Sequence, residues 1–381
     1  MRVVVAIDSF KGSLSSIEAG NIIADGIQRV YQNAEVSVHP LADGGEGTVE
    51  ALVSGMNGSI QHLTVTGPLG NPVACEYGII ENTNTAIIEM AQAAGITLLS
   101  AQERNPLFTT TYGVGEIIKD AITRGCRRFI IGIGGSVTND GGIGMLQALG
   151  YGFLDENGRE VSYGARGLSE LVSITDDAVL TELKECEFMI ACDVTNPLCG
   201  AQGCSAIFGP QKGATPAMIA DMDRWLHTYA ALAGKTYPCA DAQQPGTGAA
   251  GGLGFAFLTF TNAVLKSGIE IVLEETKLED AIRISDLVIT GEGQLDGQTA
   301  MGKAPIGVSR LAKKYNKPVL AFAGSVTSDA SACNTNGIDA FFPILRRIST
   351  LEEAMDAKCA KENLADTVEQ VFRLWAAAGM K

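Results

Sequence analysis

Short runs of consecutive hydrophobic residues alternate with amphipathic stretches along much of the chain. The apolar run at residues 3–7 predicts a buried β-strand. A helix is predicted directly after it, because Ser15 and Glu18 have the spacing of a capping box and apolar residues then recur every three or four positions. Continuous apolar strands that alternate with helices indicate a parallel sheet covered on both faces. The same signals predict strands at 36–41, 127–133, 287–290, 319–323 and 340–344, and helices at 144–150, 306–315 and 364–378.

The middle of the chain has a different pattern. Residues 64–73 predict two short strands joined by a turn. Residues 196–210 and 246–254 are rich in Pro or Gly and fit no repeat of strand and helix. We therefore expect an α/β protein in which a second, mixed α/β domain is inserted into the parallel-sheet domain. The expected parallel-sheet domain comprises residues 1–50, 102–150 and 266–381, and the inserted domain comprises residues 51–101 and 151–265.

The composition and net charge of the chain limit the number of domains and the classes of molecule that it is expected to bind. The 381 residues are enough for two or three domains, and 46% of them are hydrophobic, enough for a sizeable core. The 28 basic and 43 acidic residues give a net charge of −15, and a surface so anionic repels nucleic acid. The 45 glycines cluster between hydrophobic runs, which indicates tight loops that approach a ligand closely.

Membrane and export signals are weak in this chain. The first apolar stretch is too short for a signal peptide, and the uncharged stretch 242–265 is interrupted by Pro245 and by polar residues. The nine cysteines have no Cys-x-x-Cys spacing, which favours reduced, mostly buried thiols over zinc ligands. We expect a cytoplasmic protein without membrane or nucleic-acid partners, and a homodimer is compatible with the sequence.

Two glycine-rich segments resemble nucleotide-binding motifs without matching them fully. Residues 132–137 approach G-x-G-x-x-G, but Val137 takes the place of the third glycine. Residues 297–303 match G-x-x-x-x-G-K, but Ala304 replaces the Ser or Thr that would bind magnesium, and the preceding strand is predicted to end near residue 290. Backbone amides after a strand can still bind an anion. The candidate nucleotide contacts are therefore Gly134, Gly135, Ser136 and Gly302.

Isolated cations stand in several of the loops. Lys11, Arg104 and Lys212 lie in segments rich in Gly, Pro or Thr. Lys303 precedes Pro305, which suits the first turn of a helix, and a lysine there adds to the attraction of the helix end for anions. In a chain with so few basic residues, four such positions together favour anion contacts over solvated loop charges.

Carboxylates occur in matching places. Asp193 follows an apolar run, and the carboxyl end of a strand is where open α/β enzymes place their chemistry. Glu292 and Asp296 bracket a loop beside Lys303 and suit the oxygen preference of Mg²⁺. The sequence has three histidines and none stands beside a nucleophile signature, so we expect no Ser-His-Asp hydrolase and a carboxylate as any general base. The other acids in such loops are Asp8, Asp43, Glu46 and Asp140, of which Asp43 and Asp140 fit turn or helix capping equally well.

Six motif blocks lie in order over nearly the whole chain: DSFK (8–11), ADGGEGT (42–48), GGSVTNDGG (134–142), ACDVTNP (191–197), FGPQKG (208–213) and ITGEG (289–293). With these blocks the chain resembles the bacterial-type glycerate kinase family, class I. The resemblance implies a flavodoxin-like parallel-sheet domain with a second α/β domain, and ATP-dependent phosphorylation of D-glycerate at its 2-hydroxyl. The chain departs from the family at Ile7, where proline is common, and at Gln294, where arginine is usual.

The candidate residues suit phosphoryl transfer, which needs charge neutralisation and alignment more than covalent work by the protein. On chemical grounds, Arg104 or Lys212 is expected to hold the glycerate carboxylate. Asp193 is expected to accept the hydroxyl proton, and Lys11 and Lys303 to face the transferring phosphoryl group. We expect the transfer to be in line and to take place in a cleft between the two domains.

The remaining candidates concern the metal, the nucleotide and the substrate. Glu292 or Asp296 is expected to anchor Mg²⁺, and the amides of residues 134–136 to support the ATP phosphates. Three alternatives stay open: a nicotinamide-dependent hydroxy-acid dehydrogenase, a kinase for another small hydroxy acid, and a non-catalytic two-domain binding protein. Further expected substrate contacts are Asp8 and Asn196.

Overall fold

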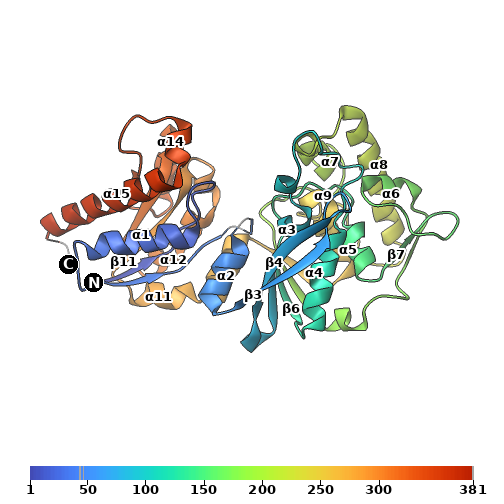
Figure 1. Ribbon diagram of the computed structural model, residues 1–381, viewed down its shortest axis with the longest axis horizontal. Helices are drawn as coiled ribbons and strands as arrows, with labels where there is room; N and C mark the ends of the chain where they lie inside the picture. Colours follow the sequence, from blue (N-terminus) through green and yellow to red (C-terminus); the bar gives the residue numbers. More distant parts are fainter. Residues whose placement is uncertain (43, 46, 380–381) are drawn as a thin grey trace. The chain divides into compact units, whose positions relative to one another are not determined.

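The computed structural model describes residues 1–42, 44–45 and 47–379 and divides into two compact units (Figure 1). Unit 1 comprises Met1–Asp43, Glu50–Met56 and Ile269–Lys381, and unit 2 comprises Gly44–Val49 and Asn57–Gly268. Each unit is built on its own β-sheet.

Unit 1 contains a sheet of five parallel strands in the order β13-β12-β11-β1-β2. Counted within this unit alone, the order is 2-1-3-4-5, which is that of the flavodoxin-like fold. The expected fold class is therefore confirmed. The apolar runs predicted as strands are buried here, including residues 3–7 and 287–289. The strands are β1 (Arg2–Val5), β2 (Glu35–Val38), β11 (Leu287–Leu295), β12 (Val319–Val326) and β13 (Ala340–Pro343).

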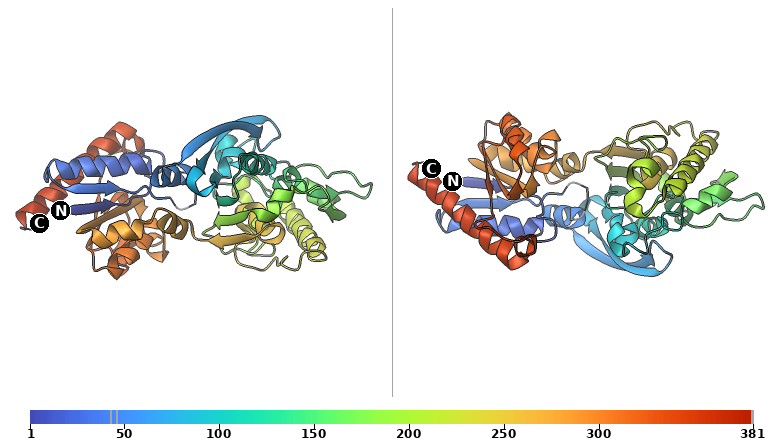
Figure 2. Two further views of the ribbon diagram at one scale, coloured as in Figure 1. Left: turned by 90° about the horizontal axis from the view of Figure 1, so that it is seen from below. Right: turned by 90° about the horizontal axis from the view of Figure 1, so that it is seen from above.

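Helices cover both faces of this sheet, as predicted. Figure 2 shows α1 (Ser16–Gln28) and α15 (Ala357–Ala377) on one face, with α11 (Leu278–Ile284) and α12 (Ala304–Lys314) on the other. The predicted capping box begins α1: the Ser15 hydroxyl accepts from the Glu18 amide, and the Glu18 carboxylate accepts from the Ser15 amide. Further helices are α2 (Thr48–Met56), α10 (Gly268–Glu275), η5 (Thr299–Met301), η6 (Ser328–Ser331), α13 (Ala332–Thr335) and α14 (Leu351–Met355).

Unit 2 contains a mixed sheet of six strands in the order β10-β9-β6-β5-β4-β3. The first four strands in this order run parallel, and β4 and β3 form the predicted hairpin, longer than expected, with Thr66 opposite Pro72. A separate antiparallel pair joins β7 (Gly152–Leu154) and β8 (Ser173–Thr175). The six strands are β3 (Ser59–Thr66), β4 (Pro72–Ile80), β5 (Thr85–Glu89), β6 (Arg128–Gly132), β9 (Glu187–Ala191) and β10 (Ala263–Lys266).

The boundaries of the two units depart from the expected domain boundaries at one long segment and at three short ones. Of the short ones, 44–49 and 266–268 belong to unit 2 and 51–56 to unit 1, the reverse of what was expected. Residues 102–150 were expected in the parallel-sheet domain, but they belong to unit 2. The physical reason is strand pairing, because β6 hydrogen-bonds to β5 on one side and to β9 on the other.

The helices of unit 2 are η1 (Glu81–Thr83), α3 (Ala91–Ala94), η2 (Ile96–Leu98), α4 (Tyr112–Thr123), α5 (Ile143–Ala148), α6 (Ala165–Glu170), η3 (Thr181–Glu185), α7 (Cys204–Phe208), η4 (Pro210–Lys212), α8 (Pro216–Ala233) and α9 (Ala249–Phe260).

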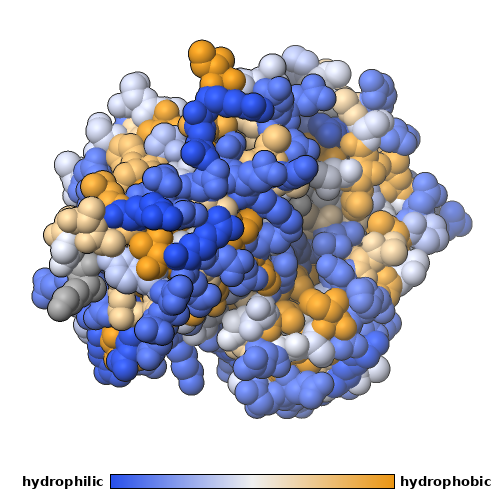
Figure 3. All heavy atoms as spheres, turned by 60° about the vertical axis from the view of Figure 1, so that its left-hand side comes forward, coloured by the Kyte–Doolittle hydropathy of each residue, from blue (hydrophilic) through white to orange (hydrophobic). Residues whose placement is uncertain are grey.

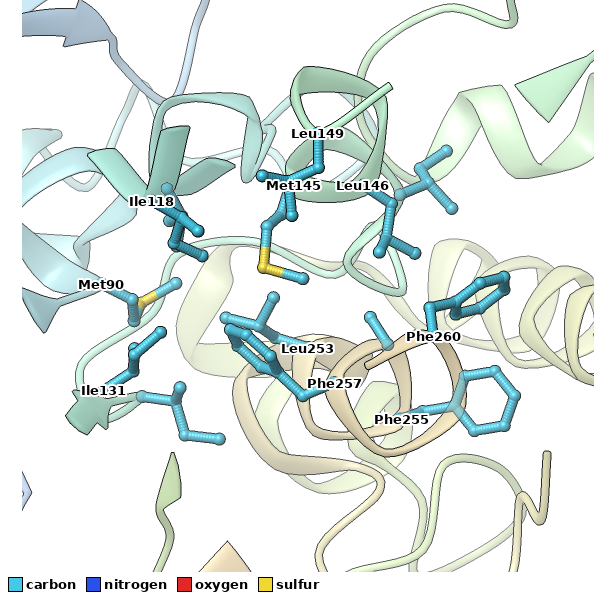
Figure 4. Packing of buried hydrophobic residues seen from close by; sticks show 14 of the residues in the cluster. Met90, Ile118, Ile131, Met145, Leu146, Leu149, Leu253, Phe255, Phe257 and Phe260 are labelled. Carbon is cyan, nitrogen blue, oxygen red and sulfur yellow. The ribbon is translucent and has the colours of Figure 1, made fainter. Parts of the chain in front are cut away.

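Helix α9 occupies the core of unit 2, which explains the long uncharged stretch in the sequence. Leu253, Phe257 and Phe260 pack with residues of α5 such as Met145 and Leu146 (Figure 4). The helix is apolar on all sides because protein surrounds it. No helix in the described ranges is both long and apolar enough to cross a bilayer.

The glycines that begin α9 serve a close backbone approach. Gly251 has a φ of 68°, in the left-handed region, and a Cβ there would lie 2.1 Å from the carbonyl oxygen of Thr138. The Gly251 carbonyl also accepts a hydrogen bond from the amide of Gly141 at 2.9 Å. This turn therefore holds the glycine-rich loop that follows β6.

On the surface, the face in Figure 3 carries hydrophobic residues in separate groups among hydrophilic ones.

All nine cysteines are free and six are buried, as predicted. Iodoacetamide at pH 8 is expected to modify the exposed Cys239 first. Burial raises the pKa of Cys75 and Cys199 to about 12, and that of Cys186 and Cys204 to about 11, so these thiols carry little of the reactive thiolate. Their modification should accelerate as the pH rises or after denaturation. Peptide mapping by mass spectrometry checks this order, and rapid labelling of Cys75 at pH 8 would contradict it.

Candidate active site

The candidate catalytic groups of unit 1 lie at the carboxyl ends of β1 and β11. The strand order reverses between β1 and β11. β2 lies on the outer side of β1, whereas β12 and then β13 lie on the outer side of β11. Ligands of open α/β sheets bind at such a reversal of strand order. A pocket of about 460 Å³ lies at this position, and its polar lining includes Asp8, Lys11, Glu292, Asp296 and Lys303. The structure therefore brings these five predicted residues together.

Thr299 connects the two carboxylates of this pocket. Its hydroxyl donates to Glu292 Oε1 at 2.5 Å, and its backbone amide donates to Asp296 Oδ1 at 2.9 Å. Lys303 Nζ lies 3.9 Å from the same Asp296 oxygen. Lys303 is the N-cap residue of α12, and a proline stands in the first turn, as predicted. Hydrogen bonds from Thr299 thus fix the carboxylates of Glu292 and Asp296.

The two carboxylates differ in their environments. Burial raises the pKa of Glu292, although the Thr299 hydrogen bond and the charges of Lys303 and Lys11 act in the opposite direction. At Asp296 burial also acts to raise the pKa, but the Thr299 amide and Lys303 outweigh it, and the pKa is lowered. Asp296 is therefore the more readily ionised of the pair.

The strand that leads into this loop is longer than predicted. β11 ends at Leu295, whereas the sequence placed its end near residue 290. The extension pairs with β12, up to Leu295 opposite Val326, although its residues are not an apolar run. The early strand end therefore does not argue against a P-loop. The absence of Ser or Thr at position 304, and the short helix η5 inside the motif, still do.

In unit 2, Lys212 is buried beneath the glycine-rich loop that follows β6. Its side chain is 1% exposed, and Nζ donates to Ser136 Oγ at 2.8 Å and to the Thr138 carbonyl at 2.6 Å. Burial lowers the pKa of Lys212 to about 8. The ammonium group thus supports the backbone of the loop from inside.

Asp140 also supports this loop. Its carboxylate accepts hydrogen bonds from the amide and hydroxyl of Thr111, both at 2.8 Å, and from the amide of Gly142 at 3.1 Å. Burial raises the pKa of Asp140, and these hydrogen bonds act against that shift. The hydrogen bond from Gly142 caps the turn that leads into α5, whereas the N-cap residue of this helix has no side-chain cap hydrogen bond.

Arg104 lies beside the same loop. Its Nη2 donates to the Ile96 carbonyl at 3.4 Å, and the Ile96 amide donates to the Gly135 carbonyl at 2.8 Å. A Cβ at Gly213 would lie 2.2 Å from the Arg104 carbonyl oxygen, so the segment that carries Lys212 adjoins Arg104. Arg104 Nε is buried and has no hydrogen-bond partner in the described part of the chain. Buried donors of this kind usually have a partner, so Arg104 Nε is an exception.

Two further predicted residues follow β9 in unit 2. Asp193 is exposed, and its Oδ1 accepts a hydrogen bond from the amide of Gly268 at 3.2 Å. Asn196 is half-buried, and its Nδ2 donates to the Gln202 carbonyl at 2.9 Å. Asp193 thus lies at the carboxyl end of a parallel strand, as predicted.

Comparison with known proteins gives a match over almost the whole chain. The model of the glycerate kinase family matches residues 3–376. The chain belongs to the glycerate kinase family. It is 48% identical to glycerate 2-kinase of Escherichia coli (strain K12) over 373 residues, which cover 97% of this chain and 98% of that protein. It is 46% identical to glycerate kinase of Bacillus subtilis (strain 168) over 378 residues, which cover 99% of this chain and 97% of the relative.

A solved structure from Salmonella typhimurium LT2 that carries the name glycerate kinase 2 is also similar. It superposes with a TM-score of 0.91, is 46% identical, and both chains are covered completely. Both units of the present chain therefore have the architecture of that structure. Membership of the glycerate kinase family argues against the dehydrogenase and the non-catalytic binding protein.

The residues predicted for this member of the glycerate kinase family fall into two sets, one in each unit. Two other candidate acids, Asp43 and Glu46, lie outside the described residues and belong to neither set. In unit 1 the set is Asp8, Lys11, Glu292, Asp296, Gly302 and Lys303, and in unit 2 it is Arg104, Gly134, Gly135, Ser136, Asp193, Asn196 and Lys212.

Sequence reasoning missed two features of the unit 1 pocket. Thr299 is one, although it lies inside the glycine-rich segment 297–303. The other is an apolar wall that includes Leu351 and Met355 of α14. No local pattern indicates that these two residues face a ligand site.

Proposed function

We propose that this chain transfers the γ-phosphoryl group of ATP to D-glycerate and forms 2-phosphoglycerate. The observation that carries the proposal is the similarity over almost its full length to glycerate 2-kinase of Escherichia coli. Membership of a kinase family implies ATP as the phosphoryl donor. The cations and carboxylates that share the unit 1 pocket support this chemistry.

The reaction is an in-line displacement. The 2-hydroxyl oxygen of glycerate forms a bond to the γ-phosphorus, the bond from that phosphorus to the bridging oxygen breaks, and ADP leaves. Lys11 and Lys303 neutralise charge on the transferring group. Asp193 accepts the hydroxyl proton as general base. That these groups meet in a single cleft stays a prediction.

The pocket also fits a magnesium ion in one respect. The described residues contain no cluster of three or more metal-ligating side chains, but Glu292 and Asp296 are two carboxylates held by one threonine. Mg²⁺ usually takes one or two protein carboxylates and completes its shell with water and substrate phosphates. Bound there with ATP, the ion would supply positive charge to the phosphate oxygens.

For the glycerate carboxylate we propose Arg104 rather than Lys212. Nζ of Lys212 already donates two hydrogen bonds within the protein, whereas Arg104 Nε is buried without a partner. Ile96 connects Arg104 to the glycine-rich loop, because its carbonyl accepts from Arg104 Nη2 and its amide donates to the Gly135 carbonyl. This proximity supports glycerate, rather than the ATP phosphates, as the anion that the loop receives.

One incubation tests the reaction. Purified protein with Mg-ATP and D-glycerate is expected to give ADP and 2-phosphoglycerate, identified by phosphorus NMR. Formation of 3-phosphoglycerate alone would contradict the proposed acceptor hydroxyl. Absence of any phosphorylated glycerate would contradict the proposed activity. A panel of other small hydroxy acids under the same conditions defines the acceptor range.

Replacement of Arg104 with glutamine is expected to raise the KM for D-glycerate about 10- to 100-fold and to leave the KM for ATP unchanged. Charge-assisted hydrogen bonds of this kind contribute roughly 1.5–3 kcal/mol. Steady-state kinetics measure both constants. Arg224→Gln is the matched control, because Arg224 is exposed on α8 and forms a local ion pair with Asp221 at 2.7 Å. An equal rise in both constants would argue against a carboxylate contact.

A further inference from the structure

One wall of the unit 1 pocket is apolar, and it contrasts with the charged residues that also line the pocket. The charged residues come from the segments after β1 and from β11 to α12, whereas the apolar wall comes from the C-terminal part of the chain. Leu351 is 79% exposed and Met355 is 40% exposed although both line a pocket. The apolar wall consists of Ile344, Leu345, Leu351, Ala354 and Met355.

Glycerate does not account for this wall. Each of its three carbons carries oxygen, so it has no apolar face to cover hydrophobic side chains. Single exposed hydrophobic residues on a protein surface need no explanation, but a group of them lining a concave site indicates a ligand or partner. A second chemical group must therefore fit beside the polar half of the pocket.

The apolar wall adjoins the loop that carries Lys11. Gly12 has a φ of 81°, in the left-handed region, and a Cβ at this position would lie 2.7 Å from Met355 Cε. The methyl group of Met355 therefore packs against the backbone next to Lys11. The anionic part of a ligand near Lys11 and an apolar part on the wall would be neighbours within one molecule.

Local interactions hold the apolar wall in place. Thr350 and Glu353 form a capping box at the start of α14, in which the Thr350 hydroxyl accepts from the Glu353 amide at 3.2 Å. Arg346 forms an ion pair with Asp366 on α15. A pre-formed wall lowers the entropic cost of binding a ligand.

Resting on the proposed function, we propose that the apolar wall is the binding site for the adenine base of ATP, with the phosphate chain extending toward Lys11 and Lys303. A purine ring has an apolar face, and in ATP it is joined to a polyanion. The contiguous apolar and charged halves of this pocket match those two parts. Leu351 and Met355 are then specificity residues for a nucleotide over a bare polyphosphate.

The test compares ATP with inorganic tripolyphosphate, which has the anionic chain but lacks the base. Leu351→Ser is expected to weaken ATP binding about five- to tenfold through lost apolar contact. Tripolyphosphate binding and the KM for D-glycerate should change less than about twofold. Isothermal titration with Mg²⁺ present measures both affinities. Because Leu351 is exposed, the melting temperature should match that of the unmodified protein.

Ile348→Ser is the matched control. Ile348 lies three residues from Leu351 and is fully exposed, but it does not line the pocket. Its replacement should leave both affinities unchanged. As a second measurement, the emission of a Leu351→Trp variant should change on addition of ATP but not of tripolyphosphate.

Two results would overturn the base site: unchanged ATP affinity in Leu351→Ser, or an equal loss for ATP and tripolyphosphate. Failure of the proposed function has a different signature. If the unmodified protein binds ATP through Leu351 but forms no phosphorylated glycerate, only the function is overturned. If it phosphorylates glycerate while Leu351→Ser binds ATP normally, only the base site is overturned.

Discussion

Replacement of Asp193 with asparagine is expected to lower kcat for D-glycerate phosphorylation about 10²- to 10⁴-fold, with ATP binding unchanged. Asparagine cannot accept the hydroxyl proton, so the general-base contribution is lost. It does keep a side-chain oxygen that can accept the hydrogen bond from the Gly268 amide, now 3.2 Å long. The variant should therefore fold normally. Steady-state kinetics and calorimetric titration with ATP measure the two effects separately.

Asp223→Asn is the matched control for this variant. Asp223 also lies in unit 2, and its Oδ1 also accepts a hydrogen bond from a glycine amide, that of Gly200, at 2.8 Å. This substitution should leave kcat unchanged. Near-normal turnover by Asp193→Asn would remove Asp193 from the role of base. Equal losses in both variants, together with lower melting temperatures, would point to a structural effect.

The elements of unit 1 were largely predictable because their signals are local. A continuous apolar run such as residues 3–7 can be buried on both faces of a sheet, and that burial is what the structure has. The capping box at Ser15 is likewise encoded within four residues. The flavodoxin-like order followed from the family resemblance rather than from these local patterns.

The choice of sheet for each strand was not predictable in the same way. β6 is an apolar strand whichever sheet it joins, and only its long-range pairing with β5 and β9 places it in unit 2. The end of β11 was missed for a related reason. Residues 291–294, Gly-Glu-Gly-Gln, have no apolar signal, and the strand continues through them to Leu295 by pairing with β12.

The chemical type of a residue predicted the candidate site better than its position in the sequence did. Charged residues in the loops after strands could be found because carboxyl ends of parallel strands share one edge. The burial of Lys212 could not be foreseen, because a lysine among Pro and Gly residues has the pattern of an exposed loop. Its partners, Ser136 and Thr138, lie more than 70 residues away in the chain.

The second large effect is expected at Lys303. Replacement with methionine should lower kcat about 10²- to 10³-fold, because the positive charge near the transferring phosphoryl group is lost. Folding should change little. The Lys303 side chain is 39% exposed, and its ion pair with Asp296 spans 3.9 Å. Exposed pairs of this kind contribute about 0–1 kcal/mol to stability. Turnover rates and melting temperatures measure the two quantities.

Lys314 offers a close control on the same helix. Its Nζ also lies 3.9 Å from a carboxylate oxygen, that of Glu279, and its side chain is 66% exposed. Lys314→Met thus removes the same charge and the same type of ion pair from α12, but outside the pocket lining. It should keep normal turnover, and Lys303→Arg should recover part of the activity lost in Lys303→Met. A kcat for Lys303→Met within about threefold of normal would exclude Lys303 from charge stabilisation, since even one donor aimed at a developing charge contributes more than that.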